Sequence, residues 1–119
     1  MRITGSGLNY EDVKDSNGPF LKRGQAVRIN YRVALSENDL IHGNLIDNSE
    51  RHAPITVRLG EGSLLLGVEE GLQDMRVGAT RLLVIPPHLA FGERGVPNRV
   101  PNNATLFVEI NISTKTETR

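Results

Sequence analysis

The sequence predicts an α+β fold in which an antiparallel sheet of four or five strands curls over one short helix. Apolar and polar residues alternate over 26–35 and 104–112, which is typical of half-buried strands, whereas apolar residues recur at helical spacing over 63–72. A helix of about ten residues is marginal alone, because packing supplies most of a protein helix's stability. The helix must therefore lie on the strands.

The strands follow from alternation and from the residues that end them. Residues 26–35 read AVRINYRVAL, which places four side chains on one face: Val27, Ile29, Tyr31 and Val33. Residues 55–59 and 80–85 predict two further strands, the second ended by Pro86 and Pro87. In 104–112 the apolar face holds Leu106, Val108, Ile110 and Ile112.

The helix is expected directly after a glycine corner. Gly60 and Gly62 permit a sharp reversal, and Ser63 stands where an N-cap oxygen would accept hydrogen bonds from the first helical amides. One helical face then carries Leu65, Val68 and Leu72.

Polar segments separate these elements. We expect turns at 15–19 and 21–24, a long excursion with one hairpin at 36–54, and a second long loop, rich in Gly and Pro, at 88–103. The last residues, 113–119, form a polar tail. At 119 residues, the chain is expected to be one domain spanning 1–119.

Composition argues against several classes of partner. Fourteen basic residues balance fourteen acidic ones, which gives no electrostatic footprint for nucleic acid or an anionic membrane. The chain has no cysteine, and its histidines, His42, His52 and His88, are never at metal-ligand spacing. We therefore expect no metal and no cofactor. With no Trp, two Tyr and three Phe, any pocket must be lined mainly by aliphatic side chains.

No targeting segment is recognisable. The N-terminal MRITGSGLNY lacks the apolar core of a signal peptide, and no apolar run approaches the roughly 20 residues that span a bilayer. The expectation is a cytoplasmic protein that is a monomer.

Several ordered motifs resemble those of the FKBP-type peptidyl-prolyl cis-trans isomerases, which bind macrolides. The longest are 67–78 (GVEEGLQDMRVG), 83–95 (LVIPPHLAFGERG) and 100–110 (VPNNATLFVEI), preceded in the same order by 7–13 (GLNYEDV), 22–25 (KRGQ) and 46–49 (IDNS). The resemblance covers about residues 7–112. It implies a five- to six-stranded sheet wrapped on one helix, with a shallow apolar pocket that takes a proline ring from a peptide or an unfolded protein.

The resemblance also implies which residues form that pocket. Tyr31, Asp47 and Phe91 take the positions of catalytic residues. Eight more take substrate-binding positions: Ile46, Ile55, Leu64, Leu65, Val68, Val96, Val100 and Val108. Val68 takes the floor, and the backbone amide of Leu65 is expected to donate to a substrate carbonyl. Leu65, Val68, Val100 and Val108 would equally suit an ordinary core.

The pocket departs from the family pattern. The family usually has Trp at Val68, Tyr at Phe91, and aromatic residues at Ile46, Ile55 and Val108. We therefore expect an isomerase of reduced activity that binds macrolides weakly. The alternative is a non-catalytic binding or chaperone module that recognises a protein partner through the same concavity or through the 36–54 excursion.

Overall fold

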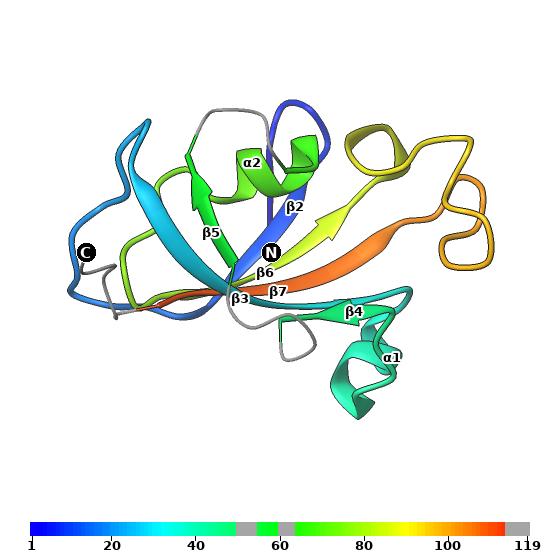
Figure 1. The fold of residues 1–119 in the computed structure, drawn as a ribbon, viewed down its shortest axis with the longest axis horizontal. Coiled ribbons are helices and arrows are strands. Elements are labelled where there is room, and N and C mark those ends of the chain that lie inside the picture. The colour runs from blue at the N-terminus through cyan, green and yellow to red at the C-terminus, as the bar shows by residue number, and fades with distance from the viewer. Residues whose placement is uncertain (50–54, 60–63, 114–119) are drawn as a thin grey trace.

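The chain folds into a curled antiparallel sheet that carries a short helix on its concave side (Figure 1). The computed structural model describes residues 1–49, 55–59 and 64–113, except the side chains of Ile55 and Val57. The elements are β1 (Arg2–Ile3), β2 (Asn9–Lys14), β3 (Ala26–Ala34), α1 (Glu37–His42), β4 (Asp47–Asn48), β5 (Ile55–Arg58), α2 (Leu66–Gly71), β6 (Thr80–Ile85), η1 (Pro87–Leu89) and β7 (Leu106–Ile112).

The sheet is built around β3 and β7. The strand order is β1-β2-β6-β7-β3-β4, and β5 also pairs with β3. One edge of β3 pairs with β7, while the other edge pairs with β5 along its first half and with β4 along its second. The predicted fold class is confirmed, and the strands without a predicted counterpart are β1, β2 and β4, of which β1 and β4 are only two residues long.

Alternation predicted the buried faces correctly. The apolar face of β7 is buried at all four positions, Leu106, Val108, Ile110 and Ile112. On β3, Val27 and Ile29 are buried, whereas Tyr31 and Val33 are half-buried; Ile29, Tyr31 and Val33 all line a cavity. The strand β2 was not predicted, because its side chains are half-buried or exposed and do not alternate between buried and exposed.

The helix α2 lies unusually close to β6. Gly67 and Gly71 face the sheet, and a methyl group on Gly71 would lie 2.6 Å from both Cδ atoms of Leu83. A methyl group on Gly67 would collide with Ile85 in the same way. Val68 and Leu72 are buried beside them, as predicted. The two glycines therefore set the height of the helix above the sheet.

The predicted N-cap at Ser63 is wrong. The N-cap is Leu65, whose carbonyl accepts from the amides of Val68 and Glu69 at 3.0 and 2.9 Å, and no side chain caps the helix. The Glu69 carboxylate instead reaches back to the Leu64 amide at 3.3 Å. The helix therefore begins later than predicted, and Ser63 itself lies outside the described residues.

Arg81 on β6 ties the other end of α2 to the sheet. This residue is only 7% exposed, and its Nη1 donates to the carbonyls of Gly71 and Gln73 at 3.1 and 2.9 Å. Its Nε donates to the Asp12 carboxylate at 2.7 Å, and its guanidinium lies over the Tyr10 ring. A cation thus satisfies carbonyls at a helix C-terminus, where it is electrostatically favoured.

The 36–54 excursion contains a second helix that the sequence analysis missed. Ser36 caps α1, because its Oγ accepts from the Asp39 amide at 3.0 Å, and Gly43 ends it with a φ of 78°. Leu40 is its only buried residue, so six residues offer no periodicity to detect. The hairpin expected inside this segment is not found in its described part, because the strand there, β4, pairs with β3 outside the segment.

We predict that Gly71→Ala destabilises the protein by about 1 to 3 kcal/mol, because the new methyl group overpacks Leu83. In an exposed helix the same change stabilises by about 1 kcal/mol. Urea unfolding measures the difference, with Gly5→Ala as the control, since a methyl group there meets nothing within 4 Å. A stabilised Gly71→Ala variant would contradict the close approach.

Candidate functional site

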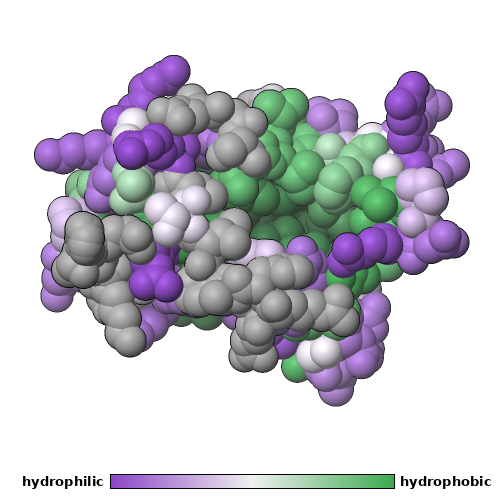
Figure 2. Space-filling model, viewed as in Figure 1, coloured by the Kyte–Doolittle hydropathy of each residue, from purple (hydrophilic) through white to green (hydrophobic). Residues whose placement is uncertain are grey.

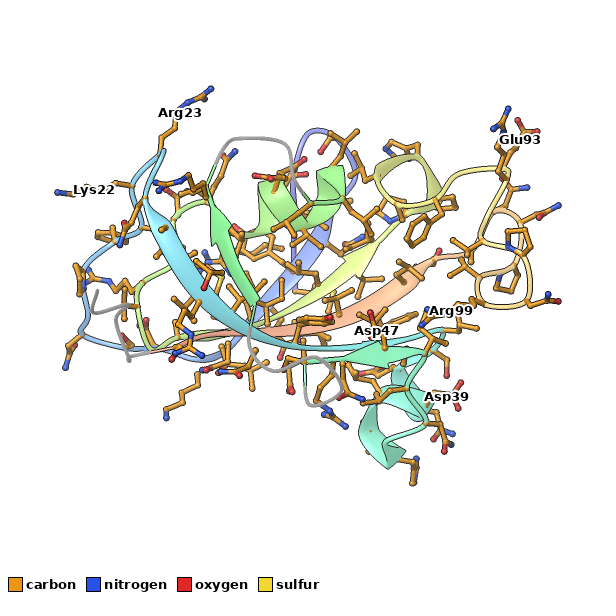
Figure 3. The ribbon with its side chains drawn as sticks, in the orientation of Figure 1. Lys22, Arg23, Asp39, Asp47, Glu93 and Arg99 are labelled. Carbon is orange, nitrogen blue, oxygen red and sulfur yellow. The ribbon has the colours of Figure 1, made fainter. Side chains whose placement is uncertain are left out.

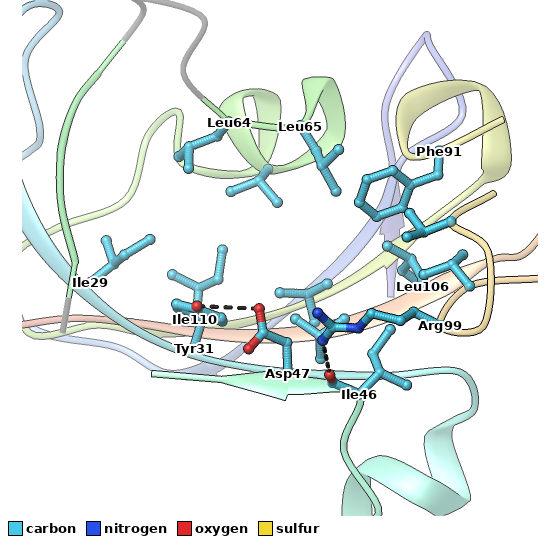
Figure 4. Close-up of a pocket in the computed structure, with 15 residues that line it drawn as sticks. Ile29, Tyr31, Ile46, Asp47, Leu64, Leu65, Phe91, Arg99, Leu106 and Ile110 are labelled. Atoms are coloured by element: carbon cyan, nitrogen blue, oxygen red, sulfur yellow. Dashed lines mark hydrogen bonds between the residues drawn. The ribbon is translucent and has the colours of Figure 1, made fainter. Parts of the chain in front are cut away.

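An apolar cavity of about 360 Å³ lies between α2, the concave face of the sheet and the 91–100 loop (Figure 4). Figure 2 shows hydrophobic atoms gathered in this hollow. The lining residues are Ile29, Tyr31, Val33, Ile46, Asp47, Leu64, Leu65, Val68, Phe91, Val96, Arg99, Val100, Leu106, Val108 and Ile110. Three of them, Ile46, Phe91 and Arg99, form the rim of the cavity.

The structure brings the predicted site residues together at this cavity, apart from Ile55, whose side chain lies outside the described atoms. The sequence analysis did not identify five lining residues: Ile29, Val33, Arg99, Leu106 and Ile110. Four of these were already on the predicted apolar faces of β3 and β7, so the alternation contained the signal. No sequence signal pointed to Arg99, because an arginine in a polar loop is usually a solvent-exposed surface residue.

Aliphatic side chains form the deep part of the cavity. Val68 is 9% exposed and Val108 is 3% exposed, and Val100 closes one side from the loop. Phe91, at 38% exposed, is the aromatic ring on the rim. The site can therefore bury a small apolar group of a ligand, with affinity derived from the area removed from water.

Tyr31 and Asp47 supply polar atoms on the wall below. The Tyr31 hydroxyl donates to Asp47 Oδ2 over a long 3.4 Å, and Asp47 Oδ1 accepts from the Asn48 amide at 2.9 Å. Ser49 fixes the wall to β3, since its amide donates to the Tyr31 carbonyl and its Oγ accepts from the Tyr31 amide. Burial, and secondarily the Asp47 carboxylate, raises the pKa of Tyr31, so the phenol is neutral at physiological pH.

The 91–100 loop is a defined turn. The amide of Val96 donates to the Val100 carbonyl at 2.9 Å, and the amide of Val100 donates back at 2.8 Å. Gly95 has a φ of 60°, and a methyl group there would collide with the Val100 carbonyl. Backbone pairing, with glycine where no Cβ fits, therefore positions Val96, Arg99 and Val100 at the cavity.

The Leu65 amide is available for a ligand. Leu65 immediately precedes α2, and within the described residues its N–H donates no hydrogen bond. Its side chain lines the cavity (Figure 4). An N–H group of this kind, beside a helix N-terminus and at an apolar site, can donate a hydrogen bond to a ligand's carbonyl oxygen.

The described residues contain no group of three or more His, Asp or Glu side chains placed to hold a metal ion. The same residues include no helix long and apolar enough to cross a membrane. The site's chemistry is that of a small apolar binding pocket with one polar wall.

Comparison with known proteins identifies the family to which this pocket and fold belong. The family model for FKBP-type peptidyl-prolyl cis-trans isomerase matches residues 18–113. FK506-binding protein 4 of Chaetomium thermophilum is 39% identical over 89% of this chain and 21% of its own length. The 46 kDa FK506-binding nuclear protein of Spodoptera frugiperda is 33% identical over 89% of this chain and 25% of its own length.

Similar solved structures support the same family. The crystal structure of AtFKBP13 superimposes with a TM-score of 0.82 at 29% identity, covering 96% of this chain and 97% of that one. FkpA from Escherichia coli gives 0.78 at 34% identity, covering 94% of this chain and 49% of that one. The chain therefore belongs to the FKBP-type peptidyl-prolyl cis-trans isomerase family. It spans about a quarter or less of the two sequence relatives.

We predict that Tyr31 titrates above its ordinary pKa of 10.0. The chain has two tyrosines, so Tyr10→Phe isolates Tyr31 for a spectrophotometric titration. Adding Asp47→Asn should lower the Tyr31 pKa without restoring its ordinary value, because burial is the larger cause. The stability that neutral Tyr31 contributes is complete below about pH 10 and is lost as the pH rises through its folded pKa. Ionisation at the ordinary pKa would contradict a buried phenol.

Proposed function

We propose that the protein is a peptidyl-prolyl cis-trans isomerase acting on X-Pro bonds of peptides or unfolded chains. The observation that supports this function is the aliphatic cavity between α2 and the curled sheet, with Tyr31 and Asp47 on one wall. Family membership points to the same reaction.

The reaction suits a pocket of this kind. An X-Pro bond rotates over a barrier of roughly 18 to 20 kcal/mol, because rotation breaks amide resonance. The twisted amide has lost its charge separation and depends less on hydration than the planar forms. A dry aliphatic site that holds the twisted form more tightly therefore accelerates the rotation without proton transfer.

The lining residues have distinct proposed roles. The proline ring would rest on Val68. The Leu65 amide, which donates no hydrogen bond within the described residues, would donate to a substrate carbonyl. The Tyr31–Asp47 pair would orient the peptide on the opposite wall. Phe91 would contact the peptide through its ring alone, because it has no hydroxyl.

We further propose that turnover is reduced and macrolide binding is weak. The positions of Val68, Ile46 and Val108 carry aliphatic side chains in place of the family's rings, and each lost ring removes apolar contact worth about 25 cal/mol per Å² buried. A second candidate function is a non-catalytic binding module, which the same Val68 and Phe91 substitutions favour.

Isomerisation of a proline tetrapeptide series, measured by NMR exchange, separates the two functions. An isomerase of this kind raises the interconversion rate of at least one peptide above the uncatalysed rate. Val68→Trp should raise the rate further, because the cavity has room for part of a larger ring, although overpacking can cost about 1 to 3 kcal/mol.

The control is Leu66→Trp, which adds the same ring on the exposed face of the same helix, where Leu66 is 65% exposed. Rates equal to the uncatalysed rate for every peptide would leave the binding module as the function. A stable Val68→Trp that changes neither rate nor ligand affinity would contradict the floor role of Val68.

Phe91→Tyr restores the hydroxyl that the family uses. We predict that it strengthens macrolide binding by about 0.5 to 1.5 kcal/mol, up to roughly tenfold, through one added hydrogen bond. Calorimetry measures this, with Phe20→Tyr as the control, because Phe20 is 52% exposed and outside the cavity lining. Tight macrolide binding by the wild type would contradict the impaired site.

A further inference from the structure

Arg99 lines the apolar cavity although it is a charged and exposed residue. It lies in the turn that Val96 and Val100 close by mutual backbone hydrogen bonds. Its Nη2 donates to the Ile46 carbonyl at 2.5 Å, which links this turn to the residue before β4 (Figure 4). The guanidinium is therefore held at the rim by a direct anchor.

Most of the donors of Arg99 remain available. A guanidinium has five N–H donors in a planar fork that fits a carboxylate. Within the described residues the Ile46 carbonyl is the only hydrogen-bond partner of the Arg99 guanidinium, which forms no ion pair there. Figure 3 places two other basic side chains, Lys22 and Arg23, at the opposite end of the sheet.

We propose that Arg99 is a specificity-determining residue that binds a substrate carboxylate beside the proline ring. The protein would then prefer X-Pro segments in which Asp or Glu directly precedes or follows the proline. This inference rests on the proposed isomerase function. Val68 and Arg99 line the same cavity, and consecutive Cα atoms are about 3.8 Å apart, so a residue next to a proline seated on Val68 would lie within the cavity or at its rim.

Asp47 is the other charged side chain of the lining. Its carboxylate could instead favour substrates with Lys or Arg next to the proline. Its carboxylate already accepts from the Tyr31 hydroxyl and the Asn48 amide. Arg99 offers unused donors and a positive charge at the more exposed position. The observations therefore favour an acidic substrate residue over a basic one.

The test compares two sets of tetrapeptides, one varying the residue before proline and one varying the residue after it, each with Glu, Gln or Lys. The ratio of kcat/KM for Glu to that for Gln should be about twofold to fivefold in one set, as expected of a partly exposed ion pair, and should fall with added salt. Arg99→Gln should bring the ratio to about one, and Arg99→Glu should shift the preference to Lys.

The ratio is measured within each variant, so it is insensitive to folding or to the amount of active protein. If Arg99 only holds the turn against Ile46, its loss slows all peptides equally and leaves the ratio unchanged, which overturns the inference. The control Arg94→Gln removes the same charge from the same loop, outside the cavity lining, and should keep the ratio.

The failures of the two proposals are distinguishable. Isomerisation without a preference for Glu in either set overturns the role of Arg99 and leaves the isomerase function intact. A preference for Lys would assign specificity to Asp47 instead. No isomerisation of any peptide overturns the function, and this inference with it.

Discussion

The close contact between α2 and β6 is the constraint on which the site depends. Two glycines, Gly67 and Gly71, leave no space for a Cβ between the helix and the side chains of Ile85 and Leu83. Arg81 fastens the C-terminal end of the helix to the same strand through the Gly71 and Gln73 carbonyls. The helix is thereby fixed at a height that turns Val68 and Leu65 into the cavity. A helix held farther from the sheet would open the cavity to water and remove the dryness on which the proposed catalysis relies.

The cavity combines an aliphatic interior with two charged side chains, Asp47 on its wall and Arg99 on its rim. The interior is a small aliphatic surface formed by Val68, Val100 and Val108. It can take a proline ring, but it offers little apolar area to bind that ring. In the proposed function, binding would therefore also use polar atoms around the ring: the Leu65 amide, the Tyr31–Asp47 pair and Arg99. On this account, the loss of aromatic rings moves selectivity from the pocket floor to its edge. A substrate would be chosen more by the residues beside the proline than by the proline itself.

Much of the fold and most of the site could be predicted from the sequence, because alternation fixes faces and ordered motifs fix the family. The strands β3 and β7 were predicted with the correct inward faces, and these faces line the cavity. Short elements were not predicted where only one side chain is buried, as Leu40 is in α1, or where no side chain is buried, as in β2. The helix start was placed too early, because a serine after glycine is a plausible cap, and the actual N-cap at Leu65 uses no side chain. The place of Arg99 at the cavity could not be predicted from the sequence, since it depends on one long-range hydrogen bond to Ile46.

The central claim is that a dry aliphatic pocket accelerates X-Pro rotation without moving a proton. The most direct measurement is kcat/KM for one proline peptide in H₂O and in D₂O, repeated across the neutral pH range. Our account predicts no solvent isotope effect and a flat pH profile, because no group in the cavity donates or accepts a proton in the transition state. A substantial isotope effect, or a bell-shaped profile that Asp47→Asn abolishes, would show that Asp47 acts as an acid or base and would contradict the account.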